Sequence, residues 1–113
     1  MKKNIVKDKS FAFALRIVKL YKYLSNEKRE YVLSKQLLRS GTAIGALVRE
    51  SEHAESRKDF IHKLAIAQKE ANESDYWLEL LFQAEFIAQN AHQSMKDDWP
   101  IDWYASHVIL NGA

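Results

Sequence analysis

Two pairs of residues in the sequence have the types and spacing of metal-binding or catalytic groups. Glu50 and His53 form a Glu-x-x-His pair, the spacing by which di-iron helical bundles place a carboxylate and an imidazole on one helix face. Such a centre needs a second Glu-x-x-His pair and further glutamates, and the sequence contains no second pair. We therefore expect no metal site and interpret Glu50 and His53 as surface residues that form salt bridges.

Glu70 and Glu73 form a Glu-x-x-Glu pair, and paired carboxylates perform acid–base chemistry when burial separates their pKa values. No sequence pattern indicates that this pair is buried. The glycine loops that hold phosphates, the His-Glu-x-x-His helices that bind zinc and the Gly-x-Ser-x-Gly elbows of hydrolases are absent from the sequence. Because there is no cysteine, thiol nucleophiles and disulfides are excluded as well. We expect a protein that is not an enzyme and has no cofactor.

The composition predicts a single all-α domain that spans residues 1–113. A chain of 113 residues with 47% hydrophobic and 28% charged residues can form one core and does not resemble a disordered protein. Three glycines and one proline are too few for the many turns of an all-β fold. The basic segment 1–9 is not followed by the apolar run of a signal peptide, and no stretch is long enough to span a membrane. We therefore expect a cytoplasmic protein with no membrane partner.

The first apolar segment predicts a helix that contacts two neighbours at once. Ser10 is its expected N-cap. The apolar residues that follow, among them Phe11, Phe13 and Ile17, cover most of the circumference of the helix. In a small protein, such a helix usually also contacts a partner chain. The polar residues 25–30 predict the connection to a second helix.

The second predicted helix carries two glycines in its middle. It begins near Leu33 and continues to about Ala54, and Gly41 and Gly45 lie four residues apart on one face. Each interior glycine costs about 1 kcal/mol relative to alanine, so the pair needs a structural reason. The expected reason is the close approach of another backbone, either within the chain or in an oligomer. The alternative is a helix that breaks in two at Gly41.

The third predicted helix is the longest. Ser56 and Asp59 form an approximate capping box before an apolar helical period that continues to about Asn90. Residues 91–113 carry no extended helical stripe. Either a short helix before Pro100 with a second short piece after it, or a poorly ordered tail, fits this divergent segment.

The charges are divided unevenly along the chain. Residues 1–39 hold eleven basic residues against three acids, and residues 40–113 hold six against twelve. One interpretation is charge complementarity between neighbouring helices. The other is a surface that binds the phosphates of a nucleic acid. Its candidate contact residues are Lys35, Arg39, Arg49, Arg57 and Lys58.

Four tyrosines are candidates for stacking on unpaired bases, or else belong to the core or to an interface. They are Tyr21, Tyr23, Tyr31 and Tyr76.

Three segments together resemble a known family. They are residues 33–50 (LSKQLLRSGTAIGALVRE), 56–61 (SRKDFI) and 71–81 (ANESDYWLELL). They resemble the four-helix-bundle proteins that are encoded in intervening sequences of bacterial 23S ribosomal RNA genes, sometimes labelled S23 ribosomal proteins. The resemblance covers about residues 5–90. It matches Arg39, Arg49, Glu50, Phe60 and Glu73 to positions of the family's pattern.

The resemblance implies an up-down four-helix bundle that assembles as a homopentamer and has no enzymatic activity. Because residues 91–113 do not match the family's fourth helix, we expect a short or irregular fourth helix. A similar accessory protein of diversity-generating retroelements binds nucleic acid and a reverse transcriptase.

These observations support two main hypotheses for the function. The first is an oligomeric bundle that binds ribosomal RNA or another nucleic acid through the five candidate basic residues. The second is a homo-oligomeric scaffold whose partner is another protein, such as a reverse transcriptase. In the scaffold hypothesis, the first helix and the face with Gly41 and Gly45 form the subunit contacts. A metal-dependent enzyme is a third, less supported possibility.

Overall fold

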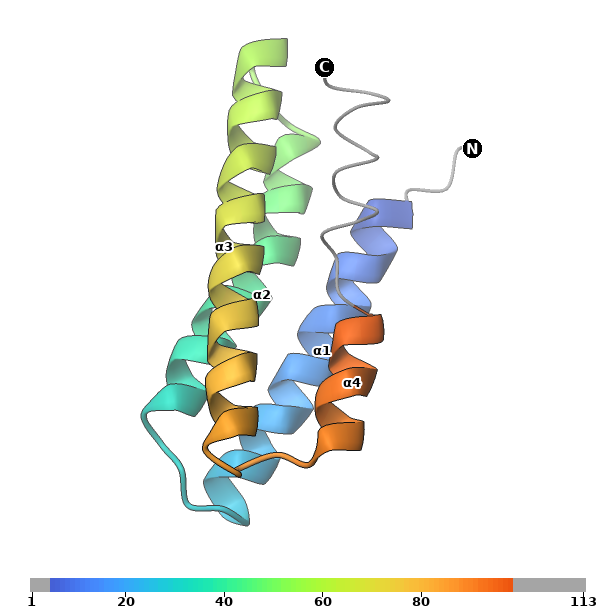
Figure 1. Ribbon diagram of the computed structural model, residues 1–113. Helices are drawn as coiled ribbons and strands as arrows, with labels where there is room; N and C mark the ends of the chain where they lie inside the picture. Colours follow the sequence, from blue (N-terminus) through green and yellow to red (C-terminus); the bar gives the residue numbers. More distant parts are fainter. Residues whose placement is uncertain (1–4, 99–113) are drawn as a thin grey trace.

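Within the part of the chain that the structure describes, four helices are joined by short turns (Figure 1). The computed structural model describes residues 5–98. Helix α1 spans Ile5–Asn26, α2 spans Leu33–Ser51, α3 spans Arg57–Gln83 and α4 spans Gln89–Asp97. Consecutive helices run in opposite directions, and α2 packs against both α1 and α3 (Figure 1). This arrangement confirms the predicted all-α, up-down bundle with a short fourth helix.

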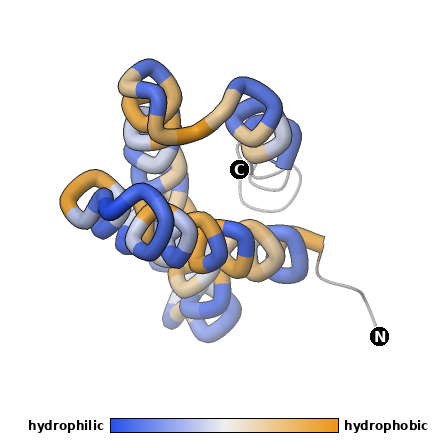
Figure 2. Tube along the Cα trace, turned by 90° about the horizontal axis from the view of Figure 1, so that it is seen from below, coloured by the Kyte–Doolittle hydropathy of each residue, from blue (hydrophilic) through white to orange (hydrophobic). Residues whose placement is uncertain are grey.

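The core lies along the faces at which the three long helices meet. Hydrophobic and hydrophilic residues alternate within the turns of each helix, as expected for amphipathic helices (Figure 2). Burial of one leucine or isoleucine side chain contributes about 1.5–3 kcal/mol. The buried hydrophobic residues are Val6, Phe13, Ile17, Leu24, Leu37, Ile44, Val48, Leu64, Ala67, Ala71, Leu78, Leu81, Ile87 and Met95.

The two glycines of α2 lie where α1 comes closest. A Cβ atom at Gly41 would lie 2.7 Å from Cγ1 of Ile17, and one at Gly45 would lie 3.4 Å from the backbone oxygen of Ser10. Helix α2 is continuous through both positions, so the alternative of a helix broken at Gly41 is wrong. The predicted close approach is confirmed, and its partner is α1 of the same chain.

Helix α1 begins earlier than the sequence predicts. Ser10 is not its N-cap, because the helix already starts at Ile5 and Val6 is buried in the core. The Ser10 hydroxyl is buried and donates a hydrogen bond to the Lys7 carbonyl one turn before it. Packing of the first turn against the core therefore extends the helix past the expected cap.

The turn between α1 and α2 is held by one acidic side chain. The Glu30 carboxylate accepts hydrogen bonds from the backbone N–H groups of Val32, Leu33 and Ser34, at 3.1, 3.0 and 2.7 Å. These are donors that the first turn of a helix leaves without a partner inside the helix. Burial by itself would raise the pKa of Glu30, but the three backbone N–H groups outweigh it and hold that pKa below its usual value. Glu30 therefore caps α2.

Helix α3 begins as predicted and ends earlier. The Ser56 hydroxyl accepts a hydrogen bond from the Asp59 N–H at 3.0 Å, which confirms the predicted cap. The helix stops at Gln83 instead of near residue 90, because Glu85 adopts a positive φ of 69° and turns the chain back toward the bundle. This reversal brings Ile87 into the core. Helix α2 likewise ends at Ser51, before the expected Ala54.

Side chains of α1 and α3 hold α4 against the bundle. The Arg16 guanidinium on α1 donates to the Ser94 carbonyl, to the Ser94 hydroxyl and to the Asp98 carboxylate, at 3.0, 2.8 and 2.6 Å. The Lys96 ammonium pairs with Asp75 on α3. Helix α4 is the short helix expected before Pro100. The second piece expected after Pro100 lies outside the described residues.

Candidate nucleic-acid interface

The five candidate basic residues are all exposed and follow the outer side of the bundle. Lys35, Arg39 and Arg49 lie on the outward face of α2, and Arg57 and Lys58 form the first turn of α3. At about 1.5 Å per residue, Lys35 and Arg49 are about 21 Å apart along α2. Lys35, Arg39 and Arg49 therefore form a row along α2, Arg57 and Lys58 follow at the start of the next helix, and the five are not gathered into a pocket.

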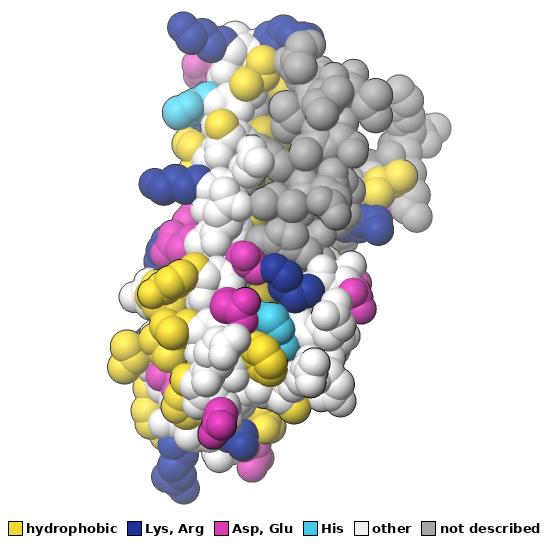
Figure 3. Space-filling model, in the orientation of Figure 1, with side chains coloured by type: hydrophobic (Ala, Val, Ile, Leu, Met, Phe, Trp, Pro, Cys, Tyr) yellow, Lys and Arg dark blue, Asp and Glu magenta, His cyan; other side chains and the backbone are white. Residues whose placement is uncertain are grey.

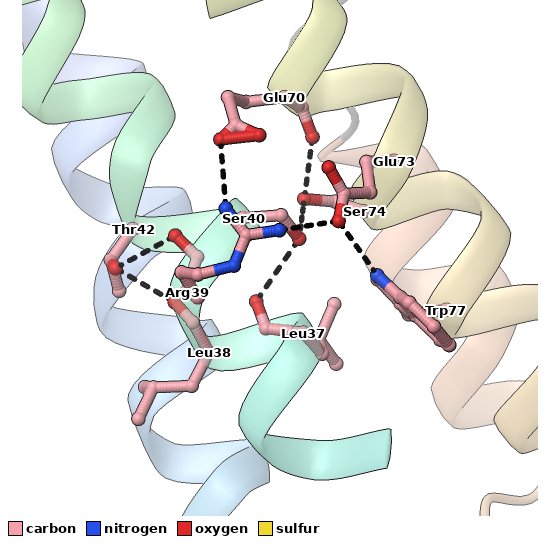
Figure 4. Close-up of polar contacts among 9 residues, drawn as sticks. All are labelled: Leu37, Leu38, Arg39, Ser40, Thr42, Glu70, Glu73, Ser74 and Trp77. Atoms are coloured by element: carbon pink, nitrogen blue, oxygen red, sulfur yellow. Dashed lines mark hydrogen bonds and ion pairs between the residues drawn. The ribbon is translucent and has the colours of Figure 1, made fainter. Parts of the chain in front are cut away.

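Arg39 pairs with two acids of α3, which partly neutralise its charge (Figure 4). Its guanidinium donates to Glu70 Oε2 at 3.4 Å and to Glu73 Oε1 at 2.5 Å. The Trp77 indole N–H also donates to Glu73 Oε1, at 3.4 Å. Because the Arg39 side chain is still 56% exposed, it can reach a phosphate, but its charge is partly compensated.

Glu70 is buried, which no sequence pattern indicated. It lies on the side of α3 that faces α2, and burial raises its pKa while the Arg39 guanidinium lowers it by less. Below it, the buried Ser74 hydroxyl donates to the Ser40 hydroxyl at 2.8 Å, or to the Glu70 carbonyl at 2.9 Å (Figure 4). Glu70 and Glu73 share one guanidinium, so the pair forms a polar network that joins α2 to α3.

Arg49 lies on the other edge of the α2 face, beside α1. Its guanidinium carbon is 5.1 Å from the centre of the Phe11 ring, within the range of a cation–π contact. Phe11 is 49% exposed and lines a shallow groove between α1 and α2. Phe13 and Ile17, in contrast, are buried in the core of their own chain. Of the five predicted packing or oligomer residues, Phe11 is therefore the one that the chain itself leaves exposed. The groove is lined by Phe11, Ala14, Thr42, Gly45, Ala46 and Arg49.

The Glu-x-x-His pair lies at the other turn of the bundle, between α2 and α3. Glu50 accepts from the Lys63 ammonium at 3.2 Å, which confirms the predicted salt bridge for this residue. Within residues 5–98, no group of three or more histidine, cysteine or acidic side chains could hold a metal ion. None of the helices described has the length and apolar character needed to cross a membrane.

Charge complementarity between helices accounts for part of the charge asymmetry. Besides Arg39, the basic residues Lys7 and Arg16 pair with acids that lie later in the chain, Glu52 and Asp98. On the face drawn in Figure 3, basic side chains lie at both ends of the molecule, and acidic and basic side chains mix in the middle. This face is therefore not one continuous basic patch.

Three of the four candidate tyrosines are exposed. Tyr23, Tyr31 and Tyr76 all lie at the surface, and Tyr21 is half-buried. The exposure of Tyr23 agrees with the sequence, in which Tyr23 interrupts the apolar surface of α1, and Tyr31 lies in the turn before α2.

The comparisons with known proteins agree with the fold. The family described as 23S rRNA-intervening sequence protein matches residues 2–99. A crystal structure from Bacteroides thetaiotaomicron VPI-5482, described as a protein with unknown function from the S23 ribosomal protein family, is 56% identical. The match covers 92% of this chain and 98% of that chain, with a TM-score of 0.90. No significant match was found among curated proteins. The chain therefore belongs to the 23S rRNA-intervening sequence protein family.

Proposed function

We propose that this protein is a non-enzymatic, oligomeric bundle that binds structured RNA through the phosphate backbone. The proposal is carried by the exposed row of basic residues on α2 and the first turn of α3. Its contacts are Lys35, Arg39, Arg49, Arg57 and Lys58, and the pairing of Arg39 with Glu70 and Glu73 reduces the contribution of that residue. Cations spaced along a surface neutralise successive phosphates without reading the base sequence. The description of the family makes ribosomal RNA the first RNA to test.

Binding of a structured 23S rRNA fragment is expected to weaken steeply with salt. Each phosphate contact contributes about 0.7–0.9 to the slope of log K against log salt concentration. The triple variant Lys35→Ala, Arg49→Ala, Lys58→Ala should therefore lower the slope by about 2. The measurement is a filter-binding titration over a range of salt concentrations.

The matched control for this titration is Lys19→Ala, which removes an exposed cation of α1 outside the row. The change in slope for Lys19→Ala should be less than one third of the change for the triple variant. Failure of the wild-type protein to retain the RNA at low salt would contradict the proposed function, and so would an unchanged slope for the triple variant.

A second candidate function is a homo-oligomeric scaffold with a protein partner such as a reverse transcriptase. The observation that favours it is the apolar groove between α1 and α2, beside which Phe11 and Leu15 are each 49% exposed. Burial of both side chains between subunits would stabilise an assembly such as the homopentamer.

The double variant Phe11→Ser, Leu15→Ser is therefore expected to convert the oligomer into folded monomers. Light scattering measures the mass, and circular dichroism checks that the helices remain. Ile61→Ser is the matched control, because it removes an exposed apolar side chain from α3. A monomeric wild-type protein would exclude the scaffold.

A further inference from the structure

The turn between α1 and α2 has a fixed conformation. Arg29 adopts a positive φ of 53°, a region that residues other than glycine seldom occupy. The Glu30 N–H donates to the Leu24 carbonyl at 2.9 Å, and the Glu30 carboxylate caps the first turn of α2. The Ser34 hydroxyl donates to the Glu30 carbonyl at 2.8 Å. Hydrogen bonds therefore tie this turn to α1 at one end and to α2 at the other.

This fixed turn holds large side chains out in solvent. Tyr31 is 51% exposed and Val32 is 70% exposed, and Tyr23 in the last turn of α1 is also exposed. Exposed apolar and aromatic groups on a rigid turn are unfavourable for the isolated protein. A ligand that covers these side chains would remove their apolar surface from water, which favours binding.

The surroundings of these side chains are basic. Lys22, Lys28, Arg29 and Lys35 are all exposed on this turn and on the helix ends that flank it. Of the two acids of the turn, Glu30 is engaged by the backbone N–H groups of α2, so the exposed acid is Glu27. Lysine is depleted in the cores of protein–protein interfaces. Rings surrounded by lysines and arginines are instead typical of surfaces that bind single-stranded nucleic acid.

We propose that the α1–α2 turn binds an unpaired nucleic-acid strand, whose bases stack on Tyr23 and Tyr31. The neighbouring cations contact the phosphates on either side, as in other single-strand binding sites. This inference rests on the proposed function and adds to it a second class of contact. The row along α2 holds the backbone of structured RNA, and the turn captures a loop or an end in which bases are free to stack.

Fluorescence anisotropy with two labelled probes tests the inference. One probe is an oligouridine of about 12 nucleotides, and the other is an RNA duplex of about the same length. The double variant Tyr23→Ala, Tyr31→Ala should weaken oligouridine binding by about tenfold or more, the effect of losing two base stacks, and change duplex binding by less than about twofold. Tyr23→Phe, Tyr31→Phe keeps both rings and should bind like the wild type. Ile61→Ala is the matched control, because it shortens an exposed apolar side chain near the start of α3, away from the turn.

The possible outcomes separate this inference from the proposed function. If the protein binds the duplex but not oligouridine, the stacking site is wrong and the proposed function stands. If it binds neither probe at low salt, both are wrong. An equal loss for both probes, or a change of oligomeric mass in the double alanine variant, would overturn the stacking site, because the turn would then serve the fold or a subunit contact.

Discussion

Replacing Gly41 with leucine is expected to lower the free energy of unfolding by about 3 kcal/mol or more. Even the first atom of the new side chain would lie 2.7 Å from Cγ1 of Ile17 and 3.0 Å from its Cγ2 and Cδ1 atoms. Ile17 is fully buried, so its side chain can move only by displacing its neighbours in the close-packed core. Helices α1 and α2 would have to separate. Urea denaturation followed by circular dichroism measures the effect.

Gly45→Ala is the matched control for this substitution. A Cβ atom at Gly45 would lie 3.4 Å from the Ser10 carbonyl oxygen, which is an ordinary contact distance. Alanine is favoured over glycine within a helix by about 1 kcal/mol, so this variant should be as stable as the wild type or slightly more stable. A Gly41→Leu protein with wild-type stability would contradict the close packing of α1 against α2.

The packing at Gly41 also affects how assembly can be tested. The scaffold hypothesis uses this glycine as a subunit contact, and a substitution there would then abolish the oligomer. Because Gly41 contacts Ile17 of its own chain, a larger residue would destabilise the protomer whether or not an oligomer forms. Substitutions of the exposed Phe11 and Leu15 avoid this difficulty, since neither side chain is part of the buried core.

Replacing Glu30 with alanine is expected to lower the free energy of unfolding by about 2–3 kcal/mol at neutral pH. The substitution removes the acceptor of three backbone N–H groups at the start of α2. It also removes a negative charge from the positive end of the helix dipole. Thermal denaturation is a suitable measurement. Glu27→Ala, which removes an exposed acid from the same turn, should change stability by less than about 0.5 kcal/mol.

The contribution of Glu30 is expected to depend on pH. Its pKa is held below the usual value, so its stabilisation is complete above the ordinary glutamate pKa of about 4.3 and is lost as the pH falls through the lowered pKa. The difference in stability between the wild type and Glu30→Gln should therefore shrink in that acidic range. A difference that stays constant to low pH would show that the charge of Glu30 does not stabilise the cap.

The contribution of Glu70 to stability changes with pH in the opposite direction. Burial raises its pKa, so its contribution is complete below the ordinary pKa and is lost as the pH rises through the raised value. The comparison of wild type with Glu30→Gln removes this effect, because Glu70 is present in both proteins.

The sequence predicted those features of the fold that are determined by residues close together in the chain. The scarcity of glycine and proline predicted long helices, and Ser56 with Asp59 predicted the start of α3, because a cap forms within one turn. Gly41 and Gly45 predicted a close contact with another helix, because two glycines on one face of a helix leave room for a neighbouring backbone. The sequence of α2 alone indicated that such a contact exists. It did not show that α1 is the helix that makes it.

Features that depend on distant residues were not predictable in this way. The early start of α1 depends on the burial of Val6, and the early end of α3 depends on a positive φ at Glu85, where no glycine marks the turn. The burial of Glu70 depends on Arg39, which lies 31 residues away in the chain. The same pairing changes the candidate site, since it partly neutralises Arg39.

The close packing in this fold joins helices that follow one another in the chain, with α2 in contact with α1 on one side and α3 on the other. The two helices of each contact are joined by a short turn. Bringing them together therefore closes a short loop and costs little chain entropy. Helical proteins with such low contact order fold in microseconds to milliseconds. The three long helices can thus assemble in their order of synthesis, each helix docking on the one made just before it.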